Sequence, residues 1–154
     1  MHISNQSAGI LLYRNINNQL EVFLVHPGGP FFKNKDEGAW SIPKGEFMPD
    51  EDPLLAAKRE FFEETGKQLT NEDAIQLSPI KQKSGKTVHA WAIAGDIDPA
   101  ALVSNMFEIE WPPRSGKQAS FAEVDRGEWF TVGVAKTKIN PAQFLLVTEL
   151  QSML

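Results

Sequence analysis

The sequence of 154 residues contains no cysteine. This absence excludes disulfide bonds, cysteine-ligated zinc, iron–sulfur clusters and thiol nucleophiles. The three histidines, His2, His26 and His89, lie far apart in the chain, so a histidine-based zinc site is not expected either. A function that depends on sulfur chemistry or on clustered imidazole rings is therefore disfavoured.

The chain also lacks an excess of positive charge and a long apolar run. Its 15 Lys and Arg against 20 Asp and Glu leave a formal net charge of -5. Proteins that coat duplex nucleic acid or an anionic membrane need a basic face. No stretch approaches the roughly 20 apolar residues of a membrane span, and the N-terminus does not resemble a secretory signal. We therefore expect a cytoplasmic monomer or homodimer without membrane or duplex nucleic-acid partners.

The composition that remains is that of an ordinary folded domain. Hydrophobic residues make up 42% of the chain and charged residues 23%, which is typical of globular proteins. A chain of this length hides roughly 70% of its surface on folding, so it needs no covalent staples. We expect one domain over residues 1–154.

Apolar segments predict strands on both sides of one well-marked helix. The helix should begin at Pro53 with Asp52 as its cap and end before Gly66, because these residue types favour those positions. A second helix is expected over residues 141–154. The expected strands cover residues 7–13, 20–26, 75–83, 87–97, 107–111 and 129–131. This order predicts an α/β (α+β) fold with a mixed β-sheet between helices.

The first predicted helix carries three carboxylates near its C-terminal end. At about 100° per residue, Glu60, Glu63 and Glu64 fall within an arc of about 100°. The like-charged pair four residues apart costs roughly 0.2 to 0.5 kcal/mol, and the helix dipole prefers cations at this end. The opposite side, which we expect to face the core, carries the apolar residues Leu54, Leu55, Phe61 and Phe62.

A bound divalent cation would reverse the sign of these unfavourable terms. Clustered carboxylate oxygens suit hard ions such as Mg²⁺ or Mn²⁺, which bridge protein carboxylates to substrate phosphates. A solvated acidic helix face is the alternative interpretation of the same three residues.

The spacing around these acids is more specific than the acids themselves. Gly45 is followed after five residues by Glu51, and after seven more by Arg-Glu-Phe-Phe-Glu-Glu-Thr-Gly at 59–66. Seven fixed identities at this spacing would match by chance with odds on the order of one in a million. The segment resembles the signature of the Nudix hydrolases. It departs from that pattern at Lys67, where the family has an aliphatic residue, and at Phe61, where a smaller aliphatic is commoner.

The resemblance implies a Nudix-type α/β/α sandwich that hydrolyses a pyrophosphate bond in a nucleoside diphosphate-linked substrate with Mg²⁺ or Mn²⁺. Residues 41–46 look like the Pro-Lys-Gly version found among dinucleoside polyphosphate hydrolases. Dinucleoside polyphosphates are therefore slightly favoured over nucleoside triphosphates as substrates. Residues 121–130 resemble a segment that supplies a further acidic group before a strand with tryptophan.

Carried over by position, the resemblance implies metal ligation by Glu60, Glu63 and Glu64. Either Glu60 or Glu63 would also position or deprotonate the attacking water. Arg59 is expected to orient these carboxylates by charge-assisted hydrogen bonds. Glu51 would buttress the preceding loop or join the metal shell.

Two further oxygen sources are implied by the same resemblance. The backbone carbonyl of Lys44 or Gly45 is one, and the glycine is expected to serve backbone geometry. Glu123 is the other, as a metal ligand or base. Its competitors for that role are Asp125, Glu108 and Glu110.

Candidate substrate contacts are less specific. The cations expected to bind phosphate are Lys44, Arg14 and Lys33. The aromatic residues expected to stack on a nucleobase are Phe31, Phe32 and Trp111, which lie next to loops rich in glycine and proline. Solvated lysines and ordinary core packing are the alternatives.

Two other functions stay open on the sequence alone. One is pyrophosphate removal from RNA 5′ ends, against which the acidic chain counts. The other is a non-catalytic module that senses a nucleotide, against which the intact acidic motif counts. Metal-dependent turnover separates the enzymes from the sensor.

Overall fold

The computed structural model describes residues 5–70 and 73–154, so His2 lies outside the described residues. Within them, seven strands form one mixed sheet and two more form a separate hairpin. The strands are β1 (Gln6–Ile16), β2 (Gln19–Pro27), β3 (Lys44–Glu46), β4 (Ala74–Gln76), β5 (Ile80–Lys81), β6 (Thr87–Ala94), β7 (Met106–Glu110), β8 (Gln118–Ala122) and β9 (Val124–Thr131). The helices are α1 (Pro53–Thr65), α2 (Val132–Lys138) and α3 (Phe144–Met153), with 3₁₀ turns at Pro99–Ala101 and Pro141–Gln143.

Strand β1 is the centre of the sheet, whose order is β4-β6-β1-β2-β9. Strand β6 runs parallel to β1. Along the other edge of β1, β3 pairs antiparallel with residues 7–9 and β2 pairs antiparallel with residues 13–16. The two neighbours therefore share one edge of β1, and β3 lies beside its N-terminal half.

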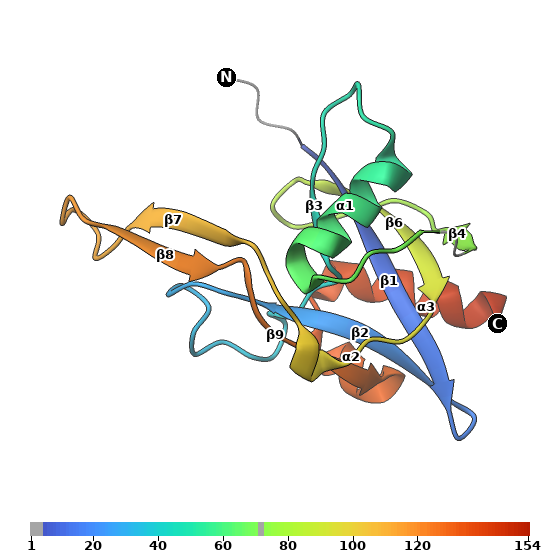
Figure 1. Cartoon of the computed structure of the whole chain (residues 1–154). Helices are drawn as coiled ribbons and strands as arrows, with labels where there is room; N and C mark the ends of the chain where they lie inside the picture. Colours follow the sequence, from blue (N-terminus) through green and yellow to red (C-terminus); the bar gives the residue numbers. More distant parts are fainter. Residues whose placement is uncertain (1–4, 71–72) are drawn as a thin grey trace.

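The sheet lies between two layers of helix, with α1 on one face and α3 on the other (Figure 1). Side chains alternate along β1, so that Ile10 and Leu12 pack on the α1 side while Leu11 packs on the α3 side. The predicted α/β/α sandwich with a mixed sheet is confirmed. No helix in the described parts of the chain is both long and apolar enough to cross a membrane.

Helix α1 has the predicted bounds because its end signals are local. The Asp52 carboxylate accepts a hydrogen bond from the Leu55 N–H at 3.0 Å. Gly66 ends the helix with φ of 84°, a left-handed conformation that glycine adopts without steric cost.

Other segments differ from the predicted elements. The strand expected over residues 75–83 is two short strands, β4 and β5, separated by a segment that contains Pro79, which has no N–H for pairing. The second predicted helix begins at Phe144, after a 3₁₀ turn. Strands β3 and β8 and helix α2 were not predicted, since all three are short.

The orientation of α1 also differs from the prediction. Leu55 and Phe62 are 66% and 45% exposed, whereas Glu60 is only 8% exposed. The small side chains Ala56 and Ala57 are buried where the helix packs closely on β1. The carboxylate arc therefore faces the protein at β3 instead of facing open solvent.

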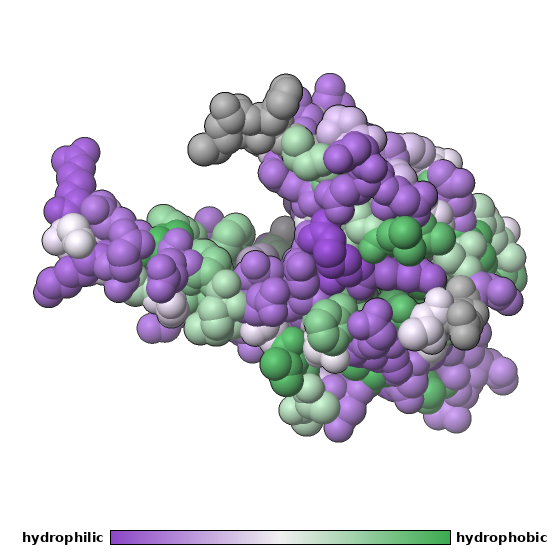
Figure 2. All heavy atoms as spheres, turned by 45° about the horizontal axis from the view of Figure 1, so that its top comes forward, coloured by the Kyte–Doolittle hydropathy of each residue, from purple (hydrophilic) through white to green (hydrophobic). Residues whose placement is uncertain are grey.

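Strands β7 and β8 form a hairpin, here called the arm, that projects away from the body of the molecule (Figures 1 and 2). Phe107 and Phe121 pair across the two strands. At the root of the arm, the Asn105 N–H donates to the Glu63 carbonyl at 2.7 Å, and the Glu123 N–H donates to the Asn105 carbonyl at 2.8 Å. These bonds join the arm to the C-terminal turn of α1.

Replacing the helix cap by Asp52→Ala is expected to lower the free energy of unfolding by about 1 kcal/mol, because the Leu55 N–H loses its acceptor. Denaturant unfolding measures this. The exposed neighbour Asp50 provides the control, and Asp50→Ala should stay within about 0.5 kcal/mol of the original protein. Equal effects of the two variants would contradict the capping role.

Candidate active site

Four glutamates from two parts of the fold form what we call the acidic cluster. Glu60, Glu63 and Glu64 come from the last turns of α1, and Glu123 comes from the connection between β8 and β9. The hydrogen bonds through Asn105 hold Glu123 beside the end of α1. The electrostatic influence of Glu123 reaches both Glu60 and Glu64, and Glu63 acts on Glu123 in turn.

Glycine at position 45 allows Glu60 to approach β3. A Cβ atom added to Gly45 would overlap the carboxyl group of Glu60. The φ angle of Gly45 is not positive, in contrast to that of Gly66. Close approach of a carboxylate, and not an unusual backbone angle, is therefore the reason that this position needs glycine.

Burial and mutual repulsion disfavour the ionised form of the glutamates in the acidic cluster. Burial, together with the negative charge of Glu63, raises the pKa of Glu60 to about 7. Burial and repulsion from Glu60 raise the pKa of Glu64 well above its ordinary value. Burial and Glu63 also raise the pKa of Glu123. A cation placed among these groups would oppose all of these effects.

Arg59 holds several carboxylates at once, as the sequence analysis predicts. One guanidinium nitrogen donates to Glu60 at 3.0 Å and to Glu63 at 3.4 Å, and the other donates to Glu51 at 3.1 Å. Glu51 in turn accepts a hydrogen bond from the Met48 N–H at 3.1 Å. This carboxylate therefore buttresses the loop before α1.

Lys44 lies on the other side of the cluster, in β3. Its backbone N–H donates to the Glu64 carboxylate. Burial lowers the pKa of the Lys44 ammonium group, while the negative charge of Glu64 raises it. Lys86, which immediately precedes β6, forms an ion pair with Glu46 close to the same ammonium group.

The donor set suits a hard divalent cation, although its oxygens now have other partners. As the side chains stand, no three acidic or histidine side chains in residues 5–70 and 73–154 are placed to hold one metal ion. Arg59 takes oxygens of Glu60 and Glu63, and a backbone N–H takes Glu64. Several carboxylates that repel one another, next to the backbone of β3, are the ligand type that Mg²⁺ and Mn²⁺ prefer.

The structure separates Glu123 from its three competitors. Asp125 accepts a hydrogen bond from the buried His26 ring at 2.9 Å. Glu110 accepts from the Arg114 N–H at 2.9 Å in the turn of the arm. Glu108 faces Ser120 across the arm.

Arg14 is not brought to the cluster. It lies six residues along β1 from Ala8, the partner of Gly45, which corresponds to about 20 Å at 3.3 Å per residue. Its guanidinium pairs with Glu21 at 2.9 Å and Asp96 at 2.7 Å. Arg14 is thus paired with two acids away from the cluster, and its contact with substrate phosphate stays a prediction.

Of the other predicted substrate residues, Lys44 lies at the acidic cluster, and Phe31, Lys33 and Trp111 gather at the arm. The Phe31 ring meets Trp111 edge to face, with 5.5 Å between centroids. Trp111 and Lys33 line a pocket there. Phe32 lies under the Lys35 ammonium group, 5.4 Å from it, and does not line that pocket.

Sequence reasoning missed Phe121, Gly29 and Pro30, which line the same pocket. The signal for Phe121 was weak, because the β8 segment is short and polar at alternate positions.

The sandwich and its acidic cluster define a protein of the Nudix hydrolase type. A model of the NUDIX domain family matches residues 4–150, nearly the whole chain, and the protein belongs to this family. The predicted class of enzyme, a Nudix pyrophosphohydrolase, is thereby confirmed. Members of this family generally use divalent metal ions. No curated protein matches the chain by sequence.

Several solved structures share the fold at low sequence identity. A binary complex of an Ap4A hydrolase from C. elegans is 19% identical over 96% of each chain, with a TM-score of 0.69. The NUDIX domain of NrtR from Shewanella oneidensis, complexed with ADP ribose, is 16% identical over 99% of this chain and 89% of its own, with a TM-score of 0.59. A MutT/nudix family protein from Listeria innocua is 16% identical over 99% and 95%, with a TM-score of 0.61.

The contact between Gly45 and Glu60 predicts the effect of one methyl group. Gly45→Ala should displace the Glu60 carboxylate and lower kcat for pyrophosphate hydrolysis by at least about 10-fold, because small misplacements of reacting groups are costly. Steady-state kinetics measures this, with circular dichroism to confirm folding. Gly133→Ala is the control, since no atom lies within 4 Å of the added Cβ. Full activity of Gly45→Ala would contradict the need for this close approach.

Proposed function

We propose that the protein hydrolyses a pyrophosphate bond in a dinucleoside polyphosphate, with Mg²⁺ or Mn²⁺ bound at the acidic cluster. The observation that carries the proposal is a cluster of four carboxylates in which Glu60 packs directly against Gly45, and in which burial and mutual repulsion raise the pKa values of Glu60 and Glu64. A cluster of carboxylates that repel one another is typical of a site where a bound cation neutralises their charge.

Glu60, Glu63, Glu64 and Glu123 would hold the cation, with the carbonyls of Lys44 or Gly45 as further oxygen donors. The bound ion supplies neutralisation of phosphate charge and a lower pKa for water. Glu63 is the candidate to position or deprotonate the attacking water. Arg59 is the positioning residue for these carboxylates, because it already contacts Glu60 and Glu63.

Lys44 is the candidate to bind a phosphate oxygen of the substrate. Its ammonium group interacts with Glu64, Glu60 and Glu46 and lies beside the cluster. A buried cation there would bind a non-bridging phosphate oxygen of the substrate more strongly than a solvated lysine would.

The choice of substrate rests on two independent supports. The Pro-Lys-Gly segment at residues 43–45 resembles that of dinucleoside polyphosphate hydrolases. The C. elegans structure that matches over 96% of both chains is described as an Ap4A hydrolase. Nucleoside triphosphates are the nearest alternative, since they present the same pyrophosphate to the cluster.

A substrate panel tests the proposal directly. Diadenosine tetraphosphate, ATP and 5′-triphosphorylated RNA would be incubated with the protein in Mg²⁺, in Mn²⁺ and in excess chelator, and the products identified. We expect metal-dependent cleavage of diadenosine tetraphosphate at the highest kcat/KM. Preference for RNA ends would overturn the substrate, and binding of nucleotide without any turnover would overturn the activity.

Removing one charge from the cluster tests its role in the reaction. Glu63→Gln keeps the shape of the side chain and is expected to lower kcat at least about 100-fold, the size of loss seen when a transition-state interaction is removed. The matched control is Glu128→Gln, on an exposed position of β9, which should keep kcat within about twofold. Retention of activity by Glu63→Gln would remove Glu63 from the mechanism.

A further inference from the structure

A pocket of about 470 Å³ lies along the arm, outside the acidic cluster, from Phe121 near the root to Trp111 near the tip. We call it the arm pocket. Its size is that of a small-molecule site. It is lined by Gly29, Pro30, Lys33, Trp111 and Phe121.

The arm pocket is bounded by the apolar face of the arm and by the loop after β2. Two strands alone are marginally stable in water, so the arm needs such a covering segment. Gly29, with φ of 93°, passes so close to the Phe107 ring that an added Cβ would stand 2.9 Å from it. Further along the loop, Phe31 contacts Trp111. The loop therefore covers part of this face and leaves the pocket open.

One end of the arm pocket, at Phe121, lies close to the acidic cluster, whereas Trp111 lies toward the tip of the arm, opposite Lys117. Phe121 is two residues before Glu123, about 7 Å along an extended chain. The loop is tied at the same place, because the Gly28 N–H donates to the Glu123 carbonyl at 2.9 Å. A substrate group in the pocket would thus be joined to a pyrophosphate at the cluster without crossing the molecule.

The side chains that line the arm pocket indicate which kind of ligand it would bind. Trp111 and Phe121 offer two aromatic side chains, and the adjoining Phe31 ring is 63% exposed. Nucleobases stack on such rings whatever their sequence identity. Lys33 adds one positive charge and no acidic residue lines the pocket among the described residues, which suits a phosphorylated ligand. Figure 2 shows hydrophobic residues on the part of the arm nearer the body and hydrophilic residues at its tip.

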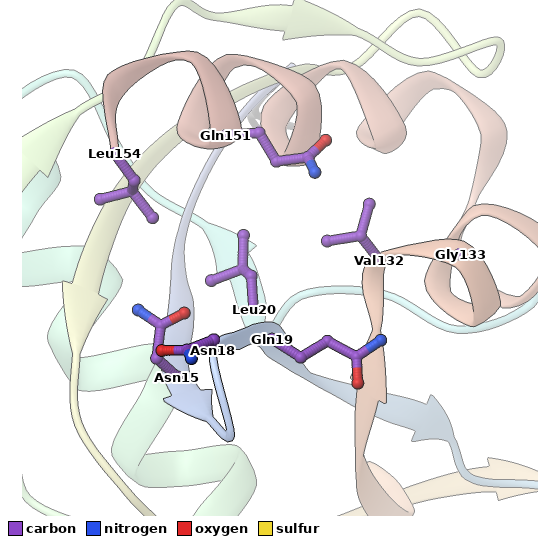
Figure 3. Close-up of a pocket in the computed structure, with 8 residues that line it drawn as sticks. All are labelled: Asn15, Asn18, Gln19, Leu20, Val132, Gly133, Gln151 and Leu154. Carbon is purple, nitrogen blue, oxygen red and sulfur yellow. The ribbon is translucent and has the colours of Figure 1, made fainter.

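A second cavity, of about 380 Å³, offers no comparable chemistry. It lies between the turn that joins β1 and β2 and the C-terminal helix (Figure 3). Its lining is Asn15, Asn18, Gln19, Leu20, Val132, Gly133, Gln151 and Leu154, with neither an aromatic ring nor a charged side chain.

We propose that the arm pocket binds a nucleobase of the substrate whose pyrophosphate lies at the acidic cluster. This inference rests on the proposed function and assigns the arm the selection of nucleotides over base-free polyphosphates. Trp111 is then a binding residue for the base, and Lys33 contacts the adjoining phosphate.

The test combines binding and kinetics on Trp111→Ala and Trp111→Phe. Calorimetry with AMP, and separately with tripolyphosphate, measures affinity without turnover. We expect Trp111→Ala to weaken AMP binding by about 10- to 100-fold and to leave tripolyphosphate binding within about twofold, because only AMP carries a base. Trp111→Phe should restore most of the AMP affinity.

The kinetic part of the test uses diadenosine tetraphosphate and the same variants. Trp111→Ala should raise KM by a similar factor while kcat stays within about threefold, since the acidic cluster is untouched. Leu145→Ala, on an exposed position of α3, is the control for a general surface effect. Lys33→Ala should weaken AMP binding without altering the fold of the arm.

The outcomes distinguish this inference from the proposed function. Unchanged AMP affinity and KM in Trp111→Ala, with normal turnover by the original protein, would overturn the assignment of base binding to the arm pocket and leave the proposed function standing. Absence of turnover in the original protein, with AMP binding lost in Trp111→Ala, would overturn the activity and support the pocket. Equal loss of AMP and tripolyphosphate binding would show a structural effect and overturn the assignment.

Discussion

The acidic cluster depends on the close approach of the Glu60 carboxylate to Gly45. Helix α1 reaches this distance because Ala56 and Ala57 let it pack closely on β1. The contact buries a charged group at the edge of the sheet, where burial normally disfavours the ionised form. Arg59 offsets part of that cost from the solvent side. A helix pressed onto the sheet through small residues therefore generates the charged site.

Strands β3 and β2 pair with the same edge of β1, one after the other, and this arrangement sets the position of the acidic cluster. Strand β3 brings Lys44 and Gly45 beside α1, and the Lys44 N–H donates to the Glu64 carboxylate. A chain of backbone hydrogen bonds then runs from Glu63 through Asn105 to Glu123 and Gly28. Helix, arm and loop are consequently connected at one place, so that groups from distant parts of the sequence keep fixed positions relative to the cluster.

Sharing a fold does not decide which substrate a Nudix protein uses. The solved structures that match this chain include an Ap4A hydrolase and a domain that binds ADP ribose, all below 20% identity. In the proposed function, the acidic motif acts on the pyrophosphate that such ligands share. Discrimination must come from parts outside the motif, and here the arm and the loop after β2 supply aromatic and cationic side chains next to it.

The sequence alone determined the features that depend on neighbours in the chain. The bounds of α1 follow from Asp52 and Gly66, whose hydrogen bond and backbone angle act within one turn, and the acidic motif follows from spacing on that helix. Only the tertiary structure decided which side of α1 is buried and that Arg14 lies far from the cluster. It also decided that, of the four candidate acids outside α1, Glu123 joins the cluster. These outcomes depend on contacts between residues as far apart as Glu63 and Glu123. A periodic pattern does not specify such contacts, because closing a long loop is governed by the packing of the whole sheet.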